Sequence, residues 1–546
     1  MILTVLKFAF AGTLIWTVIH LLDRRFRKTV LRNLPGPAPD EYLTGNLKNL
    51  VKPDSWDYHQ ELAETYGGVF SVNGFLGGKQ LYVYDTAALY QILIKDQDSY
   101  ERTPMMMAIG GLTIGQGLLN ATGDRHKRQK KMLGPIFNIA HMRSMMPIFH
   151  GITHKLRTVL HNKVANGPKQ IDMLEWVART ALELVGQAGL GFSFDPLTED
   201  GPVHPYSASM KNLAPTVSRL QIAALLLFPW GFSIGSAKFK RWIVDMTPWP
   251  TLHKARDMVD LMDSTTRQIY LDKLKAIEEG DEAVSRQIGK GKDIIAVLMK
   301  ENENASEEDK LPEQDIVDQM STLTFAAMDT TSSTISRVLQ LLTMHPDVQE
   351  KVHEELVKAR AEYGNDIPYN ELVALPWLDA VCRETLRMYP PIPTITRTTL
   401  CDTVLPLATP IIGNDGKEIR EIPLPKDTHI LVSLISSNRN PAIWGDDCLD
   451  WKPERWLKPL PDSVKEAHVP GVYSNLMSFL GGYRACIGFK FSQLEMKAVL
   501  SELLATFKFA EDKSADIHWD MSLVTGPYLK TPSGAKAALP MVVSLA

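Results

Sequence analysis

The stretch Phe479-Leu480-Gly481-Gly482-Tyr483-Arg484-Ala485-Cys486-Ile487-Gly488 places a single cysteine behind a pair of glycines. Two successive glycines let the backbone turn tightly, and Gly488 leaves room for close approach behind the cysteine. Coordination to a metal cation removes the proton of a thiol, and backbone N–H groups in such a turn stabilise the resulting thiolate. The alternative is a small, buried and inert cysteine, and Cys486 taken alone favours that alternative.

Upstream of the cysteine, a helical pattern runs from about Gln314 to Met344 and ends where Pro346 prevents continuation. A helix of this length must cross the core. Its centre, residues 329–334 (DTTSST), has poor helix propensity because these side chains compete for backbone hydrogen bonds. A local rule broken in the middle of a core helix often marks a functional site.

A second helix is predicted from about Leu378 to Tyr389, and it places Glu384 and Arg387 on one face. The stretch from Trp451 to Trp456, which includes Arg455, is predicted to be a charged aromatic loop. The charged region 278–315 is predicted to be a solvated loop that leads into the long helix. Strand patterns are few and short, at residues 81–84, 430–432 and 539–545. Without internal repeats, residues 40–546 are expected to form one large, mainly helical unit.

Composition excludes some classes of partner. The chain has 546 residues, a formal net charge of -4 and a pI near 6.4, which argues against a nucleic-acid binder. Its four cysteines form no C-x-x-C pair, so the body is expected to be reduced and cytosolic. The triplets at Asn120 and Asn304 match glycosylation sequons, but such triplets often arise by chance.

The N-terminus carries a candidate membrane anchor. Residues 1–22 are mostly apolar, and about 20 helical residues span a bilayer. A cleaved signal peptide would carry its positive charge ahead of the apolar run, whereas here Arg24, Arg25, Arg27 and Lys28 follow it. The positive-inside rule then keeps the body cytosolic. Residues 23–39, with the basic cluster and the prolines of residues 34–39, are predicted to form a stiff hinge.

The pattern F-x-x-G-x-R-x-C-x-G resembles the haem-binding signature of the cytochrome P450 family, and every fixed position matches. The resemblance continues in order and spacing through the long helix and three short motifs, which are Pro35-Gly36-Pro37, Glu384-x-x-Arg387 and Pro453-Glu454-Arg455. It implies the cytochrome P450 fold, mainly α with small β-sheets, and a haem b cofactor (iron protoporphyrin IX). By this resemblance Cys486 is the fifth ligand of the iron, and Phe479 shields its sulfur.

The resemblance also implies roles for the long helix. The run Ala326-Ala327-Met328-Asp329-Thr330 is similar to the oxygen-activation motif of the family, although the family usually has glycine where Ala327 stands. Thr330 is expected to hydrogen-bond bound dioxygen, and Asp329 to relay protons from solvent. Ala326 is expected to border the haem. The alanine at 327 narrows the groove over the iron.

Further residues are expected at the haem or beneath it. The helix around residues 123–131 resembles the family helix that reaches the haem propionates, with His126 and Lys130 in place of the usual tryptophan and arginine. Arg397 and Arg484 match other propionate contacts, and Gly482 and Gly488 belong to the cysteine signature. Glu384, Arg387 and Arg455 are expected to form a buried structural network. Three outward-facing basic side chains of this helix form a candidate docking patch for an acidic electron donor: Arg125, Arg128 and Lys131.

The implied reaction inserts one atom of dioxygen into a lipophilic organic substrate. Electrons would come from NADPH–cytochrome P450 reductase, with cytochrome b5 as an additional donor. The expected location is the endoplasmic reticulum membrane, single-pass, with the catalytic domain on the cytosolic side. A haem-thiolate isomerase, dehydratase or peroxide-driven enzyme is the second interpretation, against which Asp329 and Thr330 argue. A haem-based gas carrier or sensor is the third.

The substrate pocket is implied only in outline. Its expected lining is mostly apolar and comprises residues 105–113, Phe325 with Ala326, residues 392–395 and residues 524–528. His150 and His154 have the i,i+4 spacing of two zinc ligands, but no catalytic glutamate lies between them. These two histidines are therefore interpreted as ordinary residues of a helix surface.

Overall fold

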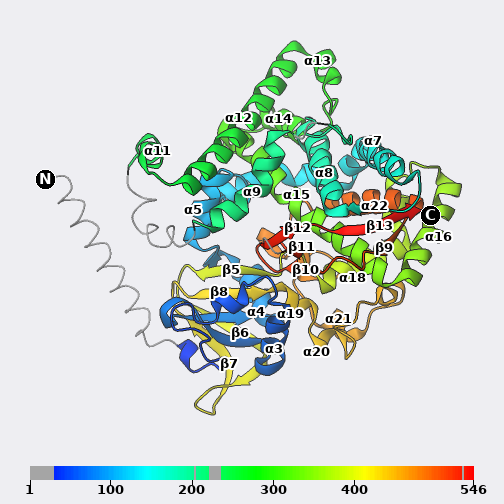
Figure 1. Ribbon diagram of the computed structural model, residues 1–546. Coiled ribbons are helices and arrows are strands. Elements are labelled where there is room, and N and C mark those ends of the chain that lie inside the picture. Colours follow the sequence, from blue (N-terminus) through cyan, green and yellow to red (C-terminus); the bar gives the residue numbers. More distant parts are fainter. Residues whose placement is uncertain (1–29, 202–203, 221–234, 532–533) are drawn as a thin grey trace.

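The computed structural model describes residues 30–201, 204–220, 235–531 and 534–546. Within these ranges helices dominate, and the smaller β-sheets lie mostly beside and below them (Figure 1). The predicted class, mainly α with small sheets, is confirmed. No helix in the described ranges is long and apolar enough to cross a bilayer. The anchor expected at residues 1–22 lies outside the described residues, as does the basic cluster that follows it.

The long helix predicted from the sequence is α15 (Glu313–Met344). It begins one residue before the predicted start, with acidic residues in its first turn, and ends at the predicted Met344. Pro346 starts the next helix, α16 (Pro346–Tyr363), because proline is tolerated in a first turn but not inside a helix. Buried side chains follow α15 along most of its length, so it crosses the core as expected.

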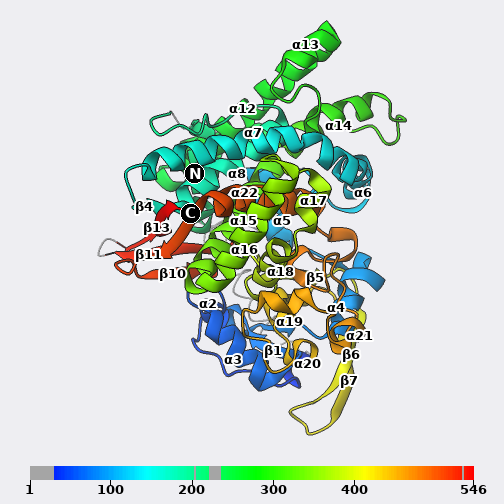
Figure 2. The same ribbon diagram turned by 90° about the vertical axis from the view of Figure 1, so that its right-hand side faces the viewer.

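Other helices surround α15 on several sides (Figures 1 and 2). The helix predicted near residue 378 is α18 (Pro376–Met388), and α22 (Phe489–Thr506) follows the cysteine stretch. Both contact α15 directly. The other helices that matter for the site are α5 (Pro104–Thr113), α6 (Gly123–Leu133), α7 (Ile139–Val164), α8 (Met173–Leu184), α9 (Pro205–Ser218), α12 (Pro250–Glu279) and α17 (Tyr369–Ala374).

The largest sheet has the strand order β1-β2-β8-β5-β3. Two of its strands were predicted from the sequence, and they pair in parallel, Leu81 with Ile430 and Val83 with Val432. The third predicted strand, near residue 540, joins a separate three-stranded sheet. The strands of the large sheet are β1 (Val69–Asn73), β2 (Lys79–Val83), β8 (His429–Ser433), β5 (Thr394–Thr399) and β3 (Tyr100–Glu101). The smaller sheets are β4 (Lys169–Asp172), β13 (Pro540–Leu545) and β9 (Phe507–Glu511); β10 (Ile517–Asp520), β11 (Gly526–Thr531) and β12 (Gly534–Ala537); and β6 (Thr403–Ile412) with β7 (Glu418–Leu424).

The loop predicted over residues 278–315 is wrong in part. Two helices form there, α13 (Asp281–Arg286) and α14 (Ile294–Glu303). Asp293 caps α14 by accepting a hydrogen bond from the N–H of Ala296 at 2.9 Å. The apolar face of α14 is buried, so packing stabilises a helix that the charged composition around it conceals.

The structure describes the expected hinge from residue 30 onward, and its proline stretch contacts the large sheet. The N–H of Ser71 donates to the carbonyl of Pro35 at 2.8 Å, and the side-chain amide of Asn73 donates to Pro37 at 2.9 Å. A methyl group on Gly36 would overlap the carbonyl of Ser71, so glycine permits this close approach. The later part of the expected hinge therefore lies against β1.

Candidate functional site

The cysteine stretch forms a tight turn before α22. The N–H of Cys486 donates to the carbonyl of Phe479 at 2.9 Å. Gly482 has φ of 70°, and a methyl group there would overlap the carbonyl oxygen of Leu93. A methyl group on Gly481 would overlap the carbonyl of Pro470. Both glycines are thus required by the packing of other backbone segments against the turn.

The thiol of Cys486 lies at the start of α22, where Gly488 is the N-cap residue. A backbone hydrogen bond from Gly488 lowers its pKa, but burial has the larger effect and raises the pKa to about 11. The residue is nevertheless exposed. A side chain that is both accessible and surrounded by protein borders an internal space. Phe479 is buried and packs edge-on against Tyr473, with ring centroids 5.6 Å apart.

The space beside Gly488 is not filled by other parts of the described chain. Its φ is -86°, an ordinary value for any residue. A methyl group there would meet only the ring of Phe137, at 4.0 Å. The room for close approach that the sequence predicts at Gly488 stays a prediction.

In the polar centre of α15, threonine hydroxyls donate hydrogen bonds to carbonyls one turn earlier in the same helix. Thr330 Oγ1 donates to the carbonyl of Ala326 at 2.8 Å, and Thr334 Oγ1 donates to that of Thr330 at 3.0 Å. Such bonds satisfy the hydroxyls and bend helices slightly. Ala326 is exposed although its helix crosses the core, so this face of α15 also borders an internal space.

Asp329 lies beside a cation that sequence reasoning missed. Burial raises the pKa of Asp329, while the positive charge of Lys211 opposes the rise. Lys211 is in α9, far from residue 329 in the sequence. No motif signals this interaction, because Lys211 and Asp329 lie on two helices that are far apart in the sequence.

Cations cluster around a single carboxylate next to the cysteine turn. Arg484 donates to Glu101 at 2.7 Å, and Arg397 is buried and donates to the carbonyl of Thr396 at 2.9 Å. Burial and neighbouring arginines lower the pKa of Arg397 to about 10. Lys130 donates to the backbone carbonyl of Tyr483, which ties α6 to the turn.

Arg102 joins this cluster and was not predicted. It donates to the carbonyl of Leu119, and burial and the charge of Arg484 lower its pKa to about 10. His126 is buried, its Nδ1 has no hydrogen-bond partner, and burial with the positive charges of Arg484 and Lys130 lowers its pKa to about 3. No sequence motif marks Arg102, because its role depends on the charge of Arg484, which is distant in the sequence.

These cations test whether the residues fit the expected cofactor. Arg102, Arg397, Arg484 and Lys130 repel one another, and among the described residues only Glu101 is paired with them by an ion pair. Buried charges are costly unless they are paired. Two carboxylates, such as the propionates of a haem, would offset most of this excess of positive charge, and they would also give His126 an acceptor. The residues present therefore fit a haem.

The residues Glu384, Arg387 and Arg455 come together as a buried network. Arg387 donates to Glu384 through Nε at 2.9 Å and Nη2 at 2.8 Å, and both side chains are fully buried. Arg455 lies 3.5 Å from the same carboxylate, and the indole N–H of Trp456 donates to it at 2.9 Å. Arg387 also donates to the carbonyls of Cys448 and Asn438.

This network reaches the cysteine turn through one asparagine. The side chain of Asn438 accepts from the N–H of Met477 at 2.7 Å and donates to Ser478 at 2.9 Å. Ser478 in turn donates to the carbonyl of Leu386 in α18, at 2.6 Å. The strand of chain that enters the turn is therefore held from the same helix that carries the buried ion pair.

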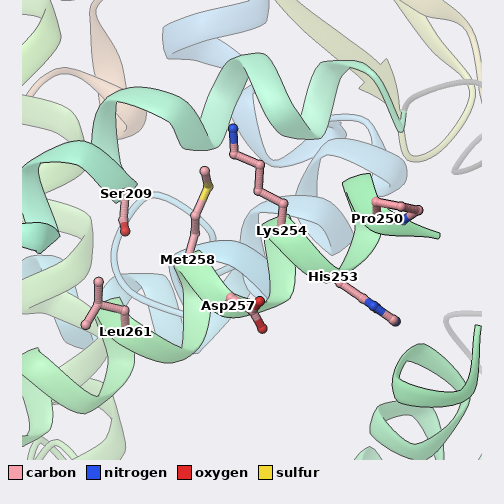
Figure 3. Close-up of a pocket in the computed structure, with 7 residues that line it drawn as sticks. All are labelled: Ser209, Pro250, His253, Lys254, Asp257, Met258 and Leu261. Atoms are coloured by element: carbon pink, nitrogen blue, oxygen red, sulfur yellow. The ribbon is translucent and has the colours of Figure 1, made fainter. Parts of the chain in front are cut away.

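The expected docking patch on α6 is partly neutralised. Arg125 forms an ion pair with Asp315 at 2.5 Å, and Lys131 with Asp309 at 2.6 Å. A surface pocket of about 550 Å³ lies between α9 and α12, and Figure 3 shows Lys254, Asp257 and Met258 at its wall. It contains none of the expected site residues.

A cysteine turn beside a surplus of buried cations suits an anionic, metal-containing cofactor of the kind that haem-thiolate proteins bind. Comparisons with known proteins agree. The model of the family described as cytochrome P450 matches residues 35–529. Cytochrome P450 monooxygenase 91 of Postia placenta is 48% identical over 541 residues, covering 99% of each chain.

Two further fungal proteins are similar over nearly their whole length. Cytochrome P450 monooxygenase 81 of Postia placenta is 46% identical, covering 97% of this chain and 95% of that protein. Ganoderic acid synthetase CYP5150L8 of Ganoderma lucidum is 42% identical, covering 100% and 99%. The chain belongs to the cytochrome P450 family. It is an oxygen-incorporating oxidoreductase of the kind that binds haem b through a cysteine thiolate, which confirms the resemblance and the cofactor inferred from the sequence.

The buried ion pair predicts a stability effect. Glu384→Gln leaves the guanidinium of Arg387 without its counter-charge in a site closed to water. We expect the free energy of unfolding to fall by about 3 to 5 kcal/mol, measured by chemical denaturation of the haem-loaded protein. The matched control is Glu418→Gln, whose ion pair with Arg420 is exposed, with an expected change within about 0.5 kcal/mol. Equal losses in both variants would show that Glu384 is not the anchor of the network.

Proposed function

We propose that Cys486 is the fifth ligand of the haem iron and that the protein is a monooxygenase of lipophilic organic substrates. The observation that best supports this proposal is the geometry of the cysteine turn. Its thiol is exposed yet enclosed by protein and receives a backbone hydrogen bond from Gly488. The turn that carries the thiol also contacts the cluster of cations around Glu101. The helix dipole of α22 and the Gly488 N–H favour a thiolate at this position.

The remaining residues hold the cofactor. Arg102, Arg397, Arg484 and Lys130 would bind the propionate carboxylates, and His126 Nδ1 would donate to one of them. Phe479, which packs edge-on against Tyr473, would shield the sulfur from water. Gly482 lets the turn approach the Leu93 backbone, and Gly488 supplies its N–H. When bound, the haem supplies dioxygen activation, to which the thiolate contributes electron density.

Proton delivery is proposed for the centre of α15. Thr330 Oγ1 donates to Ala326 and keeps its lone pairs free to accept a hydrogen bond from water. Burial raises the pKa of Asp329, which lets its carboxyl hold a proton more readily, and the positive charge of Lys211 opposes this rise. The methyl group of Ala327 would narrow the groove of α15 over the haem iron. Thr330 and Asp329 are the proposed catalytic residues. Thr330 would contact the oxygen, and Asp329 would supply protons to it.

The substrate pocket is proposed where three distant segments meet. The N–H of Thr525 donates to the carbonyl of Pro391 at 2.9 Å, and Ser333 of α15 donates to the carbonyl of Thr525 at 2.5 Å. On the other side Thr396 Oγ1 contacts the sulfur of Met106 at 3.1 Å. The expected lining residues of α5, β5 and residues 524–528 thus border one another. Their apolar composition supports a lipophilic substrate.

The partner and location are proposed from the sequence. NADPH–cytochrome P450 reductase would supply electrons, with cytochrome b5 as a second donor. Residues 1–22 would anchor the protein in the endoplasmic reticulum membrane, with the catalytic domain cytosolic because basic residues follow the span. Stoichiometric NADPH consumption with substrate and reductase distinguishes this proposal from a reductase-independent haem-thiolate enzyme and from a gas sensor.

The ligand assignment is tested by the spectrum of the reduced, carbon monoxide-bound protein. Wild-type protein should show the strongly red-shifted Soret band of thiolate ligation, and Cys486→His should lose it because imidazole replaces the sulfur. Cys401→Ser is the matched control, since Cys401 is also accessible but lies in another part of the fold. Haem-loaded, folded wild type without the band would contradict the assignment, as would its loss in the control.

The role of Thr330 is tested by coupling. Thr330→Ala should keep the haem and the thiolate spectrum, because the hydroxyl bonds to Ala326 and not to the ligand turn. Product formed per NADPH should fall while hydrogen peroxide rises, because a positioned proton-transfer group can contribute on the order of 10²-fold to its step. Thr343→Ala removes a comparable hydroxyl, bonded to Gln340 near the end of α15, and should leave coupling unchanged. Unchanged coupling in Thr330→Ala would mean that protons arrive by another route.

The anchor is tested by deleting residues 1–28. The shortened protein should leave the membrane fraction in large part and keep its haem, because the described contacts of the cysteine turn begin beyond this segment. Protease added to intact microsomes should digest the body of the full-length chain. Protection of the body, or glycans on Asn120 or Asn304, would overturn the proposed orientation.

A further inference from the structure

Two histidines that the sequence suggests are ordinary surface residues are joined by a third side chain. His150 and His154 lie one turn apart on α7, and Asp366 reaches them from the connection between α16 and α17. One nitrogen of each imidazole and one carboxylate oxygen all lie within 4.8 Å of one another. In the part of the chain that the structure describes, no other such group of metal-binding side chains is found.

The spacing is close to that of a tetrahedral metal site. Zinc binds imidazole nitrogen and carboxylate oxygen at about 2.0 to 2.2 Å, so neighbouring ligand atoms are about 3.3 to 3.5 Å apart. His154 Nε2 lies 3.0 Å from Asp366 Oδ1, and His150 Nδ1 lies 3.8 Å from the same oxygen. Because these values fall on either side of the ideal, small side-chain rotations would equalise them.

The short contact in this group is not a hydrogen bond. His154 Nε2 is buried and has no hydrogen-bond partner, although Asp366 Oδ1 is only 3.0 Å away. The two atoms are near each other but are not aligned for an N–H donor. Ligands of one metal behave in this way, since their lone pairs converge on a third point and not on each other.

The surroundings orient the ligands and limit the charge. His150 has a hydrogen bond with the backbone of Ile367, the kind of outer contact that fixes the orientation of a metal-binding imidazole. Glu502 of α22 is buried, lies 3.9 Å from His154 Nε2, and pairs with Arg157 and Arg360 at 2.7 Å each. The positive charges of Arg157 and Arg360 balance the negative charges of Glu502 and Asp366. An added cation therefore meets no large net electrostatic field of either sign.

We propose that His150, His154 and Asp366 bind one divalent transition cation, with Zn²⁺ as the best fit, and that water completes the coordination. Two imidazoles and one carboxylate favour zinc over magnesium or calcium, which prefer oxygen ligands alone. The cation would join α7 to the connection before α17, beside the end of α22. It is a structural site, separate from the residues proposed for the haem.

Acid should weaken the site. An imidazole must be neutral to bind a metal, so affinity falls as protons compete at low pH. Burial, the largest influence, lowers the pKa of His150, Asp366 raises it, and the positive charge that His154 would carry lowers it. Glu502 also raises it, and Glu502 is itself paired with Arg157 and Arg360.

The test is direct metal binding to the full-length, haem-loaded protein without an affinity tag. After treatment with a chelator, the protein is equilibrated with buffered Zn²⁺, and zinc and iron are counted by elemental analysis. Wild type should approach one zinc per iron, and X-ray absorption at the zinc edge should show imidazole ligands. The melting temperature should rise with zinc concentration, because a cation bound only by the folded state stabilises it.

The variants decide between a metal site and a plain contact. Asp366→Asn keeps the shape of an exposed side chain and should weaken zinc binding about 100-fold, because losing a ligand costs at least as much as losing an outer-shell partner. His154→Ala should abolish the stoichiometric site. His161→Ala, on the same helix and exposed, is the matched control and should bind zinc as wild type does. Wild type that binds well below one zinc per iron, or equal binding in Asp366→Asn, would overturn the proposal and leave a helix-to-loop contact only.

Discussion

Glu384 and Arg387 face each other in a region that water does not reach, and this imposes order on a long stretch of chain. A buried guanidinium must satisfy all its donors, and here the backbone carbonyls of Asn438, Cys448 and Asp450 supply the acceptors that the carboxylate cannot. The loop that carries these carbonyls is thereby fixed to α18. Through Asn438 the same constraint extends to Met477 and Ser478, which lead into the cysteine turn. The position of the thiol thus depends on a charge pair that never touches it.

The fold was predictable where one local rule dominates. Pro346 and Pro390 mark the ends of α15 and α18, and β2 and β8 have the apolar strand patterns that the structure pairs. The β6–β7 hairpin was missed because Pro406 and Pro410 interrupt the pattern of its first strand. The structure accommodates them with a register shift between Pro406 and Ile411. Helix α14 was missed because charged residues surround its short apolar face. That face stabilises the helix only when it is packed against the rest of the protein.

The site divides in the same way. The cysteine turn, the Glu384 pair and the polar centre of α15 are short-range patterns, and the structure places each within one element or turn. Arg102 and Lys211 could not be predicted, because each becomes relevant only when a distant element brings a charge next to it. Asp366 is hidden for the same reason, although the spacing of His150 and His154 is visible in the sequence. Sequence patterns therefore reveal chemistry within an element better than chemistry between elements.

The contacts of the cysteine turn also determine an order of assembly during synthesis. Tyr483 N–H donates to Gln97 at 2.8 Å, Arg484 binds Glu101 at 2.7 Å, and Gly482 packs on the backbone of Leu93. Residues 93–101 leave the ribosome long before residues 482–484, so they must wait without their partners while most of the chain is made. Contacts so distant in sequence form slowly, and the waiting surfaces invite aggregation. A chain that stalls before the turn therefore gains no partial site, and the cell must protect the unfinished product until the cysteine segment arrives.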